Sequence, residues 1–184
     1  EHEEEVEYDE HIWLSLRNAE VLTDEIAQAL QKIDPANAGT YKDNAAAYIE
    51  KLDALDQAYQ AAVAEAARNT LLFGDRFPFR YLVDDYGLSY YAAFVGCSAE
   101  TEASFETISF LAQKVDELSL PVVMTIEGSD HRIAETIIQN TQGQDQKICS
   151  MDSMQSITGK DVEQGAAYLT IMEHNLTALK EALQ

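Results

Sequence analysis

The chain has 184 residues, of which 46% are hydrophobic and 24% are charged, so it is long and apolar enough for one globular unit with its own core. Its 33 acidic and 12 basic residues give a formal net charge of −21 at pH 7. A nucleic-acid binder needs a Lys/Arg surface that this chain does not have, and docking on an anionic membrane is disfavoured for the same reason.

The acidity is concentrated at the start, where seven of the first ten residues are acidic and none is basic. This Glu/His run looks like a mature or excised segment, so we expect the chain to be part of a longer protein. No run of eighteen apolar residues occurs, and no basic leader with an apolar stretch is present. The two cysteines, Cys97 and Cys149, have no metal-type spacing, which favours free, partly buried thiols.

Two helices are predicted in the first third of the chain. Apolar residues recur at helical spacing over residues 16–32, and Asp34-Pro35 ends this helix because proline restricts the residue before it. Over residues 36–68 the apolar positions recur at steps of four and three among many alanines, which predicts one long helix. At 1.5 Å per residue it spans roughly 45 Å, so we expect it to brace something larger or to bridge two lobes.

Beyond residue 70, short apolar runs alternate with helical patterns. Strands are predicted at 71–73, 90–94, 122–126 and 147–149, and helices at 79–86, 103–118, 130–140 and 161–183. This alternation predicts an α/β fold, a four-stranded parallel sheet with helices on both faces. The chain is therefore divided into an acidic arm with a His segment (1–15), a helical region with the long helix (16–69) and an α/β unit (70–184).

Several carboxylates follow the predicted strands directly. Ligand sites of open α/β sheets lie beyond the carboxyl ends of the strands. The residues at these ends are Gly74-Asp75-Arg76, Gly96-Cys97-Ser98, Glu127-Gly128-Ser129-Asp130 and Met151-Asp152-Ser153. For Asp130 and Ser98, capping of the next helix is the simpler alternative. Gathered carboxylates repel one another unless a cation or an arginine lies among them, and Arg76 and Arg132 are the available arginines.

Two of the four histidines are candidate ligands. His11 lies between Glu10 and an apolar run just before a helix, where a structural role is the alternative to metal binding. His131 follows Asp130 at the end of the third strand and is the weaker candidate. No glycine-rich nucleotide loop, nucleophile elbow or His-Glu-x-x-His motif occurs, which weakens every enzyme hypothesis.

One segment carries a family resemblance. It reads Asp9-Glu10-His11-Ile12-Trp13-Leu14 and is followed by Arg17-Asn18-Ala19. This segment resembles the Asp-Pro-His-x-Trp-Leu…Asn-Ala segment of extracytoplasmic zinc and manganese substrate-binding proteins of ABC transporters, which include adhesin-like lipoproteins. Similar stretches occur along nearly the whole chain, among them Asp34-Pro35-Ala36-Asn37, Tyr86-Gly87-Leu88, Met151-Asp152-Ser153-Met154 and Met172-Glu173-His174-Asn175-Leu176.

The resemblance implies two α/β lobes around one metal ion. In that arrangement this chain is the linker helix plus the carboxy-terminal lobe, and the amino-terminal lobe, which normally brings a histidine ligand, is missing. The resemblance also implies that His11 and Asp152 are metal ligands.

A third ligand position departs from the family pattern. Family members carry His or Glu there, ten residues before the Tyr-Gly pair, and this count places Arg76 at the position. Arginine has no lone pair for a cation, so we expect Asp75 to be the third ligand, with Arg76 beside it. Alternatively, Arg76 pairs with Asp152 or Glu127 and keeps the site closed until metal arrives.

We therefore expect a monomeric, non-enzymatic protein outside the cytoplasmic membrane, periplasmic or membrane-anchored, that captures a divalent cation for the permease of an ABC importer. Histidine with carboxylates suits zinc, which the acidic, His-bearing arm also favours, and manganese is the second choice. Two alternatives stay open: a magnesium-dependent hydrolase or phosphotransfer domain that uses Asp75, Glu127 and Asp152, and an acidic interaction module without metal.

Overall fold

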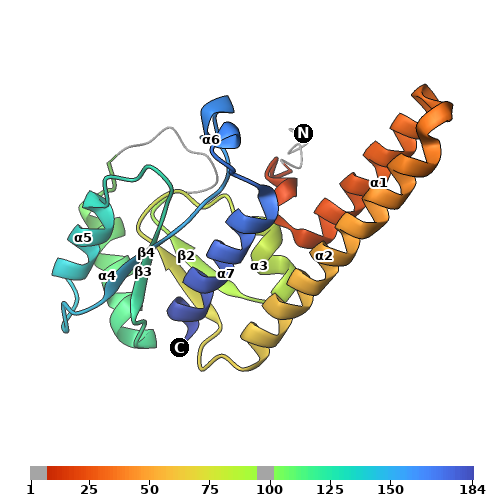
Figure 1. Ribbon diagram of the computed structural model, residues 1–184. Helices are drawn as coiled ribbons and strands as arrows, with labels where there is room; N and C mark the ends of the chain where they lie inside the picture. Colours follow the sequence, from red (N-terminus) through yellow and green to blue (C-terminus); the bar gives the residue numbers. More distant parts are fainter. Residues whose placement is uncertain (1–7, 95–101) are drawn as a thin grey trace, which may run out of the picture.

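The computed structural model describes residues 8–94 and 102–184. Four parallel strands form one sheet in the order β2-β1-β3-β4, and helices lie on both of its faces (Figure 1). The strands are β1 (Thr70–Phe73), β2 (Ser89–Ala92), β3 (Val122–Ile126) and β4 (Lys147–Met151). The predicted α/β fold with four parallel strands is confirmed.

The described helices follow the predicted pattern. They are α1 (Leu16–Ile33), α2 (Ala38–Ala64), α3 (Arg80–Tyr86), α4 (Phe105–Leu118), α5 (Arg132–Gln139), α6 (Gly159–Glu163) and α7 (Tyr168–Leu183). Short 3₁₀ turns, η1 (Ile12–Leu14) and η2 (Pro35–Asn37), precede α1 and α2. Most boundaries lie close to those expected, because the apolar periodicity of each element matches the face that it buries.

The two faces of the sheet carry separate cores, since successive strand residues point to opposite sides. Leu71 and Phe73 pack with α2, α3 and α7, whereas Leu72 between them packs with α4 and α5. Nearly continuous apolar runs in β1 and β3 are therefore buried on both faces, as expected for a parallel sheet.

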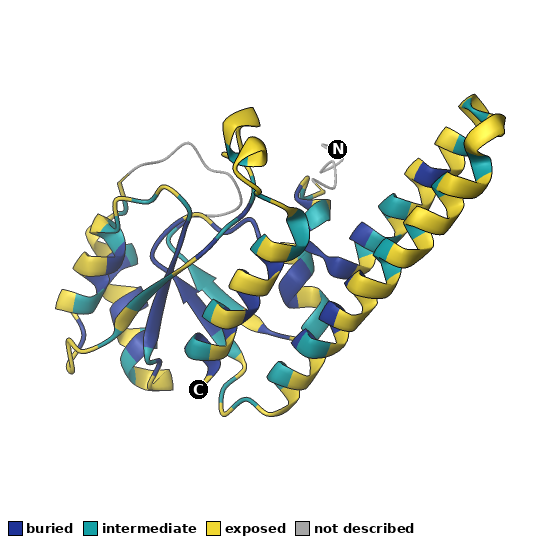
Figure 2. Ribbon diagram, in the orientation of Figure 1, coloured by how far each residue is buried: buried dark blue, intermediate teal, exposed yellow. Residues whose placement is uncertain are grey.

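Helices α1 and α2 form an antiparallel pair that projects away from the sheet (Figure 1). This pair is here called the helical arm, to distinguish it from the acidic arm of residues 1–15. At 1.5 Å per residue the 27 residues of α2 span about 40 Å. Its second half is fixed to the lobe by Leu52, Leu55 and Tyr59, which are buried, whereas most of the outer part of the helical arm is exposed (Figure 2). The long helix thus reaches well beyond the lobe to which it is attached.

The helical region predicted at 161–183 is present, but it is divided into two elements. The structure has two helices, α6 and α7, separated at Gly165, whose φ of 98° is a conformation that glycine adopts readily and other residues rarely do. The expected long helix also ends earlier, at Ala64. No described helix is long and apolar enough to cross a membrane.

Of the two cysteines, Cys149 lies half-buried on β4 and its thiol is free, as predicted. Its Sγ lies 3.4 Å from Glu181 Oε2. The expected strand-two end at Gly96, Cys97 and Ser98 lies outside the described residues.

Removal of the Tyr59 hydroxyl tests how α2 is attached to the lobe. This side chain is fully buried and donates to the carbonyl of Met172 in α7 at 2.7 Å. We expect Tyr59→Phe to lower the free energy of unfolding by about 1 kcal/mol, because a buried hydrogen bond is lost. Urea unfolding measures this, with Tyr41→Phe as the control: its hydroxyl bonds to Asp34 at the surface, and its loss should cost clearly less. Equal effects of the two variants would contradict the assignment.

Candidate metal centre

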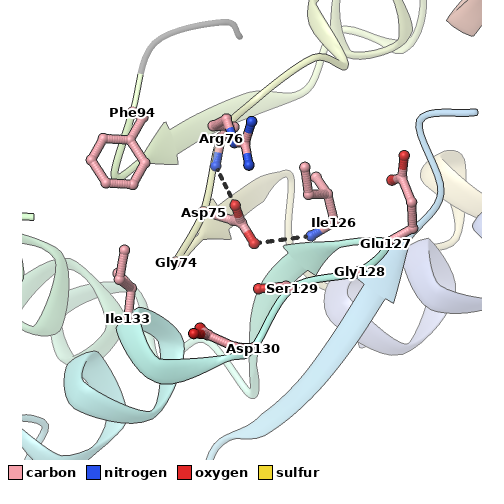
Figure 3. A pocket seen from close by; sticks show the side chains of 10 residues that line it. All are labelled: Gly74, Asp75, Arg76, Phe94, Ile126, Glu127, Gly128, Ser129, Asp130 and Ile133. Atoms are coloured by element: carbon pink, nitrogen blue, oxygen red, sulfur yellow. Dashed lines mark hydrogen bonds between the residues drawn. The ribbon is translucent and has the colours of Figure 1, made fainter. Parts of the chain in front are cut away.

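The carboxyl ends of β1, β3 and β4 lie at one edge of the sheet and carry Asp75, Glu127 and Asp152. Asp75 is 9% exposed and its two oxygens each accept a backbone N–H. Oδ1 lies 2.8 Å from the nitrogen of Arg76, and Oδ2 lies 3.4 Å from that of Ile126 (Figure 3). Gly74 lets this strand end approach α5, since a Cβ there would meet the Cα of Ala134 at 2.7 Å. The carboxylate thus ties the end of β1 to the end of β3.

The backbone at Asp152 and Ser153 is held from two sides. The buried amide of Asn175 in α7 accepts from the nitrogen of Asp152 at 2.7 Å and donates to its carbonyl at 2.8 Å. The carboxylate of Glu127 accepts from the nitrogen of Ser153 at 2.8 Å and from its hydroxyl at 2.6 Å. These four bonds fix the direction in which the Asp152 side chain leaves the strand.

The charge of Asp152 lies in a partly dry environment. Burial is the main cause that raises the pKa of its carboxyl, and the nearby negative charge of Glu127 adds to this, while the N–H of Met154 acts in the opposite direction. A cation bound beside Asp152 reverses this balance, because it favours the ionised carboxylate.

His11 is almost completely buried and is oriented by Asp9. Asp9 Oδ1 accepts from the backbone nitrogen of His11 at 2.8 Å and lies 2.7 Å from its ring Nδ1. When Nδ1 donates to this carboxylate, the lone pair of the neutral ring is at Nε2. Carboxylates hold metal-binding imidazoles in this way in other proteins.

The segment that carries His11 is fastened to the Asp152 loop. Trp13, in η1, donates from its indole nitrogen to the carbonyl of Ser153 at 3.0 Å. Tyr168 donates to the carbonyl of Trp13 at 2.7 Å, and Tyr81 donates to that of Asp9 at 2.8 Å. The imidazole of His11 packs edge-on to the ring of Trp13, with centroids 5.4 Å apart. His11 and Asp152 are therefore linked through Trp13 and Ser153.

One group of potential ligands stands out among the residues that the structure describes. Ligand atoms of Asp9, Glu10 and His11 lie within 4.8 Å of one another. Within the described residues, the three predicted ligands, His11, Asp75 and Asp152, do not form such a group. A physical reason is that Asp75 turns toward the backbone N–H groups at the strand ends.

A cavity of about 240 Å³ opens beside Asp75. Its lining residues are Gly74, Asp75, Arg76, Phe94, Ile126, Glu127, Gly128, Ser129, Asp130 and Ile133 (Figure 3). Arg76 is exposed there, and within residues 8–94 and 102–184 its guanidinium forms no ion pair with Asp152 or Glu127. The structure therefore does not contain the ion pair by which Arg76 was expected, in the alternative, to keep the site closed.

Two other predicted positions have mainly local roles. Asp130 accepts from the backbone nitrogen of Arg132 at 3.1 Å and pairs with its guanidinium. The N-cap residue of α5 is His131, whose side chain makes no capping bond, so Asp130 contacts the first turn of α5 without being its cap. His131 precedes α5 with a φ of 61°, and among the described residues its buried Nδ1 has no hydrogen-bond partner. It is not one of the residues that line the cavity.

Comparison with known proteins identifies the family. Residues 1–182 match the family described as "Zinc-uptake complex component A periplasmic". The chain belongs to this family. The zinc-binding lipoprotein AdcA of Streptococcus pneumoniae is 33% identical over 175 residues, which are 95% of this chain and 34% of that protein. The high-affinity zinc uptake system protein ZnuA of Bacillus subtilis is 27% identical, with 53% of its length covered.

Solved structures agree with this placement. The metal-dependent lipoprotein YcdH of Bacillus subtilis superposes with a TM-score of 0.82 at 27% identity, covering 96% of this chain and 65% of that one. The Zn(II)-bound ZnuA-like domain of Streptococcus pneumoniae AdcA gives a TM-score of 0.76 at 31% identity, with 64% of that chain covered. The expected family resemblance is confirmed, and this chain spans about a third to a half of the length of the curated relatives named above.

The role of Asn175 can be measured through stability. We expect Asn175→Ala to lower the free energy of unfolding by about 3 kcal/mol, because the N–H and carbonyl of Asp152 both lose a buried partner. Chemical denaturation measures the change. Asn140→Ala is the matched control, since its exposed amide donates to a carbonyl of its own helix. A loss no larger than that of the control would show that Asn175 does not hold the Asp152 backbone.

Proposed function

We propose that this chain is the linker helix and carboxy-terminal lobe of an extracytoplasmic solute-binding protein that captures a divalent metal ion for an ABC importer. The observation that carries the proposal is the buried imidazole of His11, oriented by Asp9, in a segment that Trp13 fastens to the carbonyl of Ser153, in a chain of the zinc-uptake family. The family description and the lipoprotein relatives support a periplasmic or membrane-anchored location.

Zinc is the metal we propose first. Imidazole nitrogen and carboxylate oxygen are ordinary zinc ligands, whereas a site made mainly of oxygen ligands suits manganese. The relatives named as zinc-binding and the Zn(II)-bound structures point in the same direction. We assign His11 and Asp152 as ligands and keep Asp75 as the third candidate, although both of its oxygens already accept backbone N–H groups.

A second lobe completes the site in this proposal. About a third of the length of the solved relatives lies outside the part that this chain covers. Ile26, Leu30 and Ile33 recur at steps of four and three on α1 and are 61%, 38% and 80% exposed. Apolar side chains on one helix face are typical of a surface that is covered in the whole protein. We infer that the other lobe packs on the helical arm formed by α1 and α2.

The family match and the local contacts argue against the catalytic alternative. A hydrolase would use Asp75, Glu127 and Asp152 around magnesium, yet Asp75 and Glu127 hold the N–H groups of the neighbouring loops. We infer that the chain binds and delivers its cation without making or breaking a covalent bond.

Loss of single ligands tests the proposal. We expect His11→Ala and Asp152→Asn each to weaken zinc binding at least about 100-fold. Loss of a residue that only orients a metal ligand already costs about 10–100-fold in metal affinity. Competition with a chromophoric chelator measures the affinity. His174→Ala, on the exposed side of α7, is the matched histidine control and should bind like the unchanged chain. Unaltered zinc affinity in both ligand variants would overturn the site.

The orienting role of Asp9 gives a second measurement. We expect Asp9→Ala to weaken zinc binding about 10–100-fold while the fold is retained, because the imidazole loses the carboxylate that fixes its ring position. The ¹⁵N shifts of the His11 ring should report a change of tautomer. Asp24→Ala serves as the control, because Asp24 is exposed on α1 and accepts from the side chain of Gln28. An unchanged tautomer and affinity would assign Asp9 a purely local role.

A further inference from the structure

Helix α3 holds the segment that carries His11 at both of its ends. The hydroxyl of Tyr81 donates to the carbonyl of Asp9 at 2.8 Å, two residues before His11. The hydroxyl of Ser15, four residues after His11, donates to Oδ2 of Asp85 at 2.5 Å. Tyr81 and Asp85 are four residues apart on α3, a spacing that places two side chains on the same face of a helix. One face of α3 therefore contacts the chain on both sides of the histidine.

The backbone between these two contacts has little freedom. The nitrogen of Leu14 donates to the carbonyl of His11 at 3.1 Å, and Leu14 and Ser15 are almost fully buried. Ser15 is also the N-cap of α1, and its hydroxyl oxygen accepts from the nitrogen of Asn18 at 3.0 Å. The position of the His11 imidazole thus depends on where the two ends of this short segment are held.

Helix α3 is itself fixed to the sheet. Phe79, Leu82 and Val83 are at most 1% exposed and belong to the same apolar core as Phe73 of β1. The rings of Phe73 and Phe79 are stacked with centroids 5.4 Å apart, which anchors the start of α3 to the strand. The position of the sheet is therefore transmitted through α3 to the segment of His11.

The carboxylate that accepts from Ser15 is held by a second helix. Nη1 of Arg17 in α1 lies 3.9 Å from Oδ1 of Asp85, and its Nε lies 3.6 Å from Oδ1 of Asp56 in α2. Asp56 is 6% exposed and accepts from the hydroxyl of Tyr86, in α3, at 2.8 Å. Burial raises the pKa of the Asp85 carboxyl, whereas Ser15 and Arg17 act in the opposite direction. Asp85 is thus tied to the start of α1 by a hydrogen bond and by charge.

We propose that α3 positions the histidine of the metal centre, with Tyr81 and Asp85 as the two residues that fix the ends of its segment. This inference rests on the proposed function and adds two positioning residues, which act through the carbonyl of Asp9 and the hydroxyl of Ser15. A ligand that is held in place before the metal ion arrives loses less conformational freedom on binding. Both contacts therefore raise the affinity for the metal ion.

Zinc affinity and cobalt(II) spectra test the proposal. We expect Tyr81→Phe and Asp85→Ala each to weaken zinc binding about tenfold, the lower end of the range for residues that orient a metal ligand. Asp85→Asn keeps an oxygen that can accept from Ser15, so it should retain most of the affinity that Asp85→Ala loses. Competition with a chromophoric chelator measures zinc binding. The visible spectrum of bound cobalt(II) reports the geometry of its ligands and should change in Tyr81→Phe and Asp85→Ala.

The matched control is Asp84→Ala, which removes the exposed neighbour of Asp85 that pairs with Arg80 on the same helix. It should bind zinc and cobalt(II) like the unchanged chain. The free energy of unfolding is measured for every variant, and Tyr81→Phe, which removes a single oxygen atom, decides the matter if Asp85→Ala does not fold.

A lower stability of Tyr81→Phe and Asp85→Ala without a change in affinity or spectrum would assign both residues a purely structural role and overturn the inference. An equal loss of affinity in Asp84→Ala would overturn it as well. Both outcomes leave the proposed function intact, whereas absence of zinc binding in the unchanged chain overturns the proposed function and this inference together.

Discussion

Three side chains from three separate elements hold the backbone of Asp152 and Ser153, and the geometry of the candidate centre depends on them. Trp13 comes from η1, Glu127 from the end of β3 and Asn175 from α7. Each satisfies a backbone group that would otherwise be buried or half-buried without a partner, so the arrangement is favoured energetically as well as geometrically. The position of one loop is therefore fixed jointly by the amino-terminal segment, the end of a strand and a helix.

The strong acidity of the chain acts differently at different places. On the surface it keeps the protein away from polyanions and raises the local concentration of cations. At the sheet edge, Asp75 and Glu127 accept backbone N–H groups at the strand ends and in the loops that follow, which stabilises this edge. Asp152 differs, because burial raises its pKa and a cation would relieve that cost. Acidic residues at the same edge of the sheet thus lie in different environments.

Much of the fold was predictable from the sequence, because the apolar period of each strand and helix is set by the face that it buries. The site was less so. Asn175 lies on the apolar face of α7, three residues after Met172 and four before Leu179, and a polar residue on such a face is a signal that a buried partner exists. Which backbone it pairs with depends on contacts 23 residues away, which no local pattern contains.

Other differences have equally specific causes. The break at Gly165 was outweighed in the sequence by the helix-favouring residues around it, although glycine with positive φ marks it in the structure. Asp9 was visible only as part of a family motif, yet a carboxylate two residues before a histidine can bond to its backbone N–H and ring together. The expected role of Asp75 depended on the direction of one side chain, which strand alternation does not fix beyond the strand end.

The contacts of Trp13 set the order in which the centre can form. Its indole bonds to a carbonyl 140 residues later, and its own carbonyl accepts from a tyrosine 155 residues later. During synthesis or export, the histidine next to Trp13 therefore emerges long before the groups that fix its position. Closing such a distant contact is slow compared with forming a helix. The nascent chain thus exposes His11 before Asp152 and α7 are available, and the centre that we propose for metal binding forms only when α7 has docked.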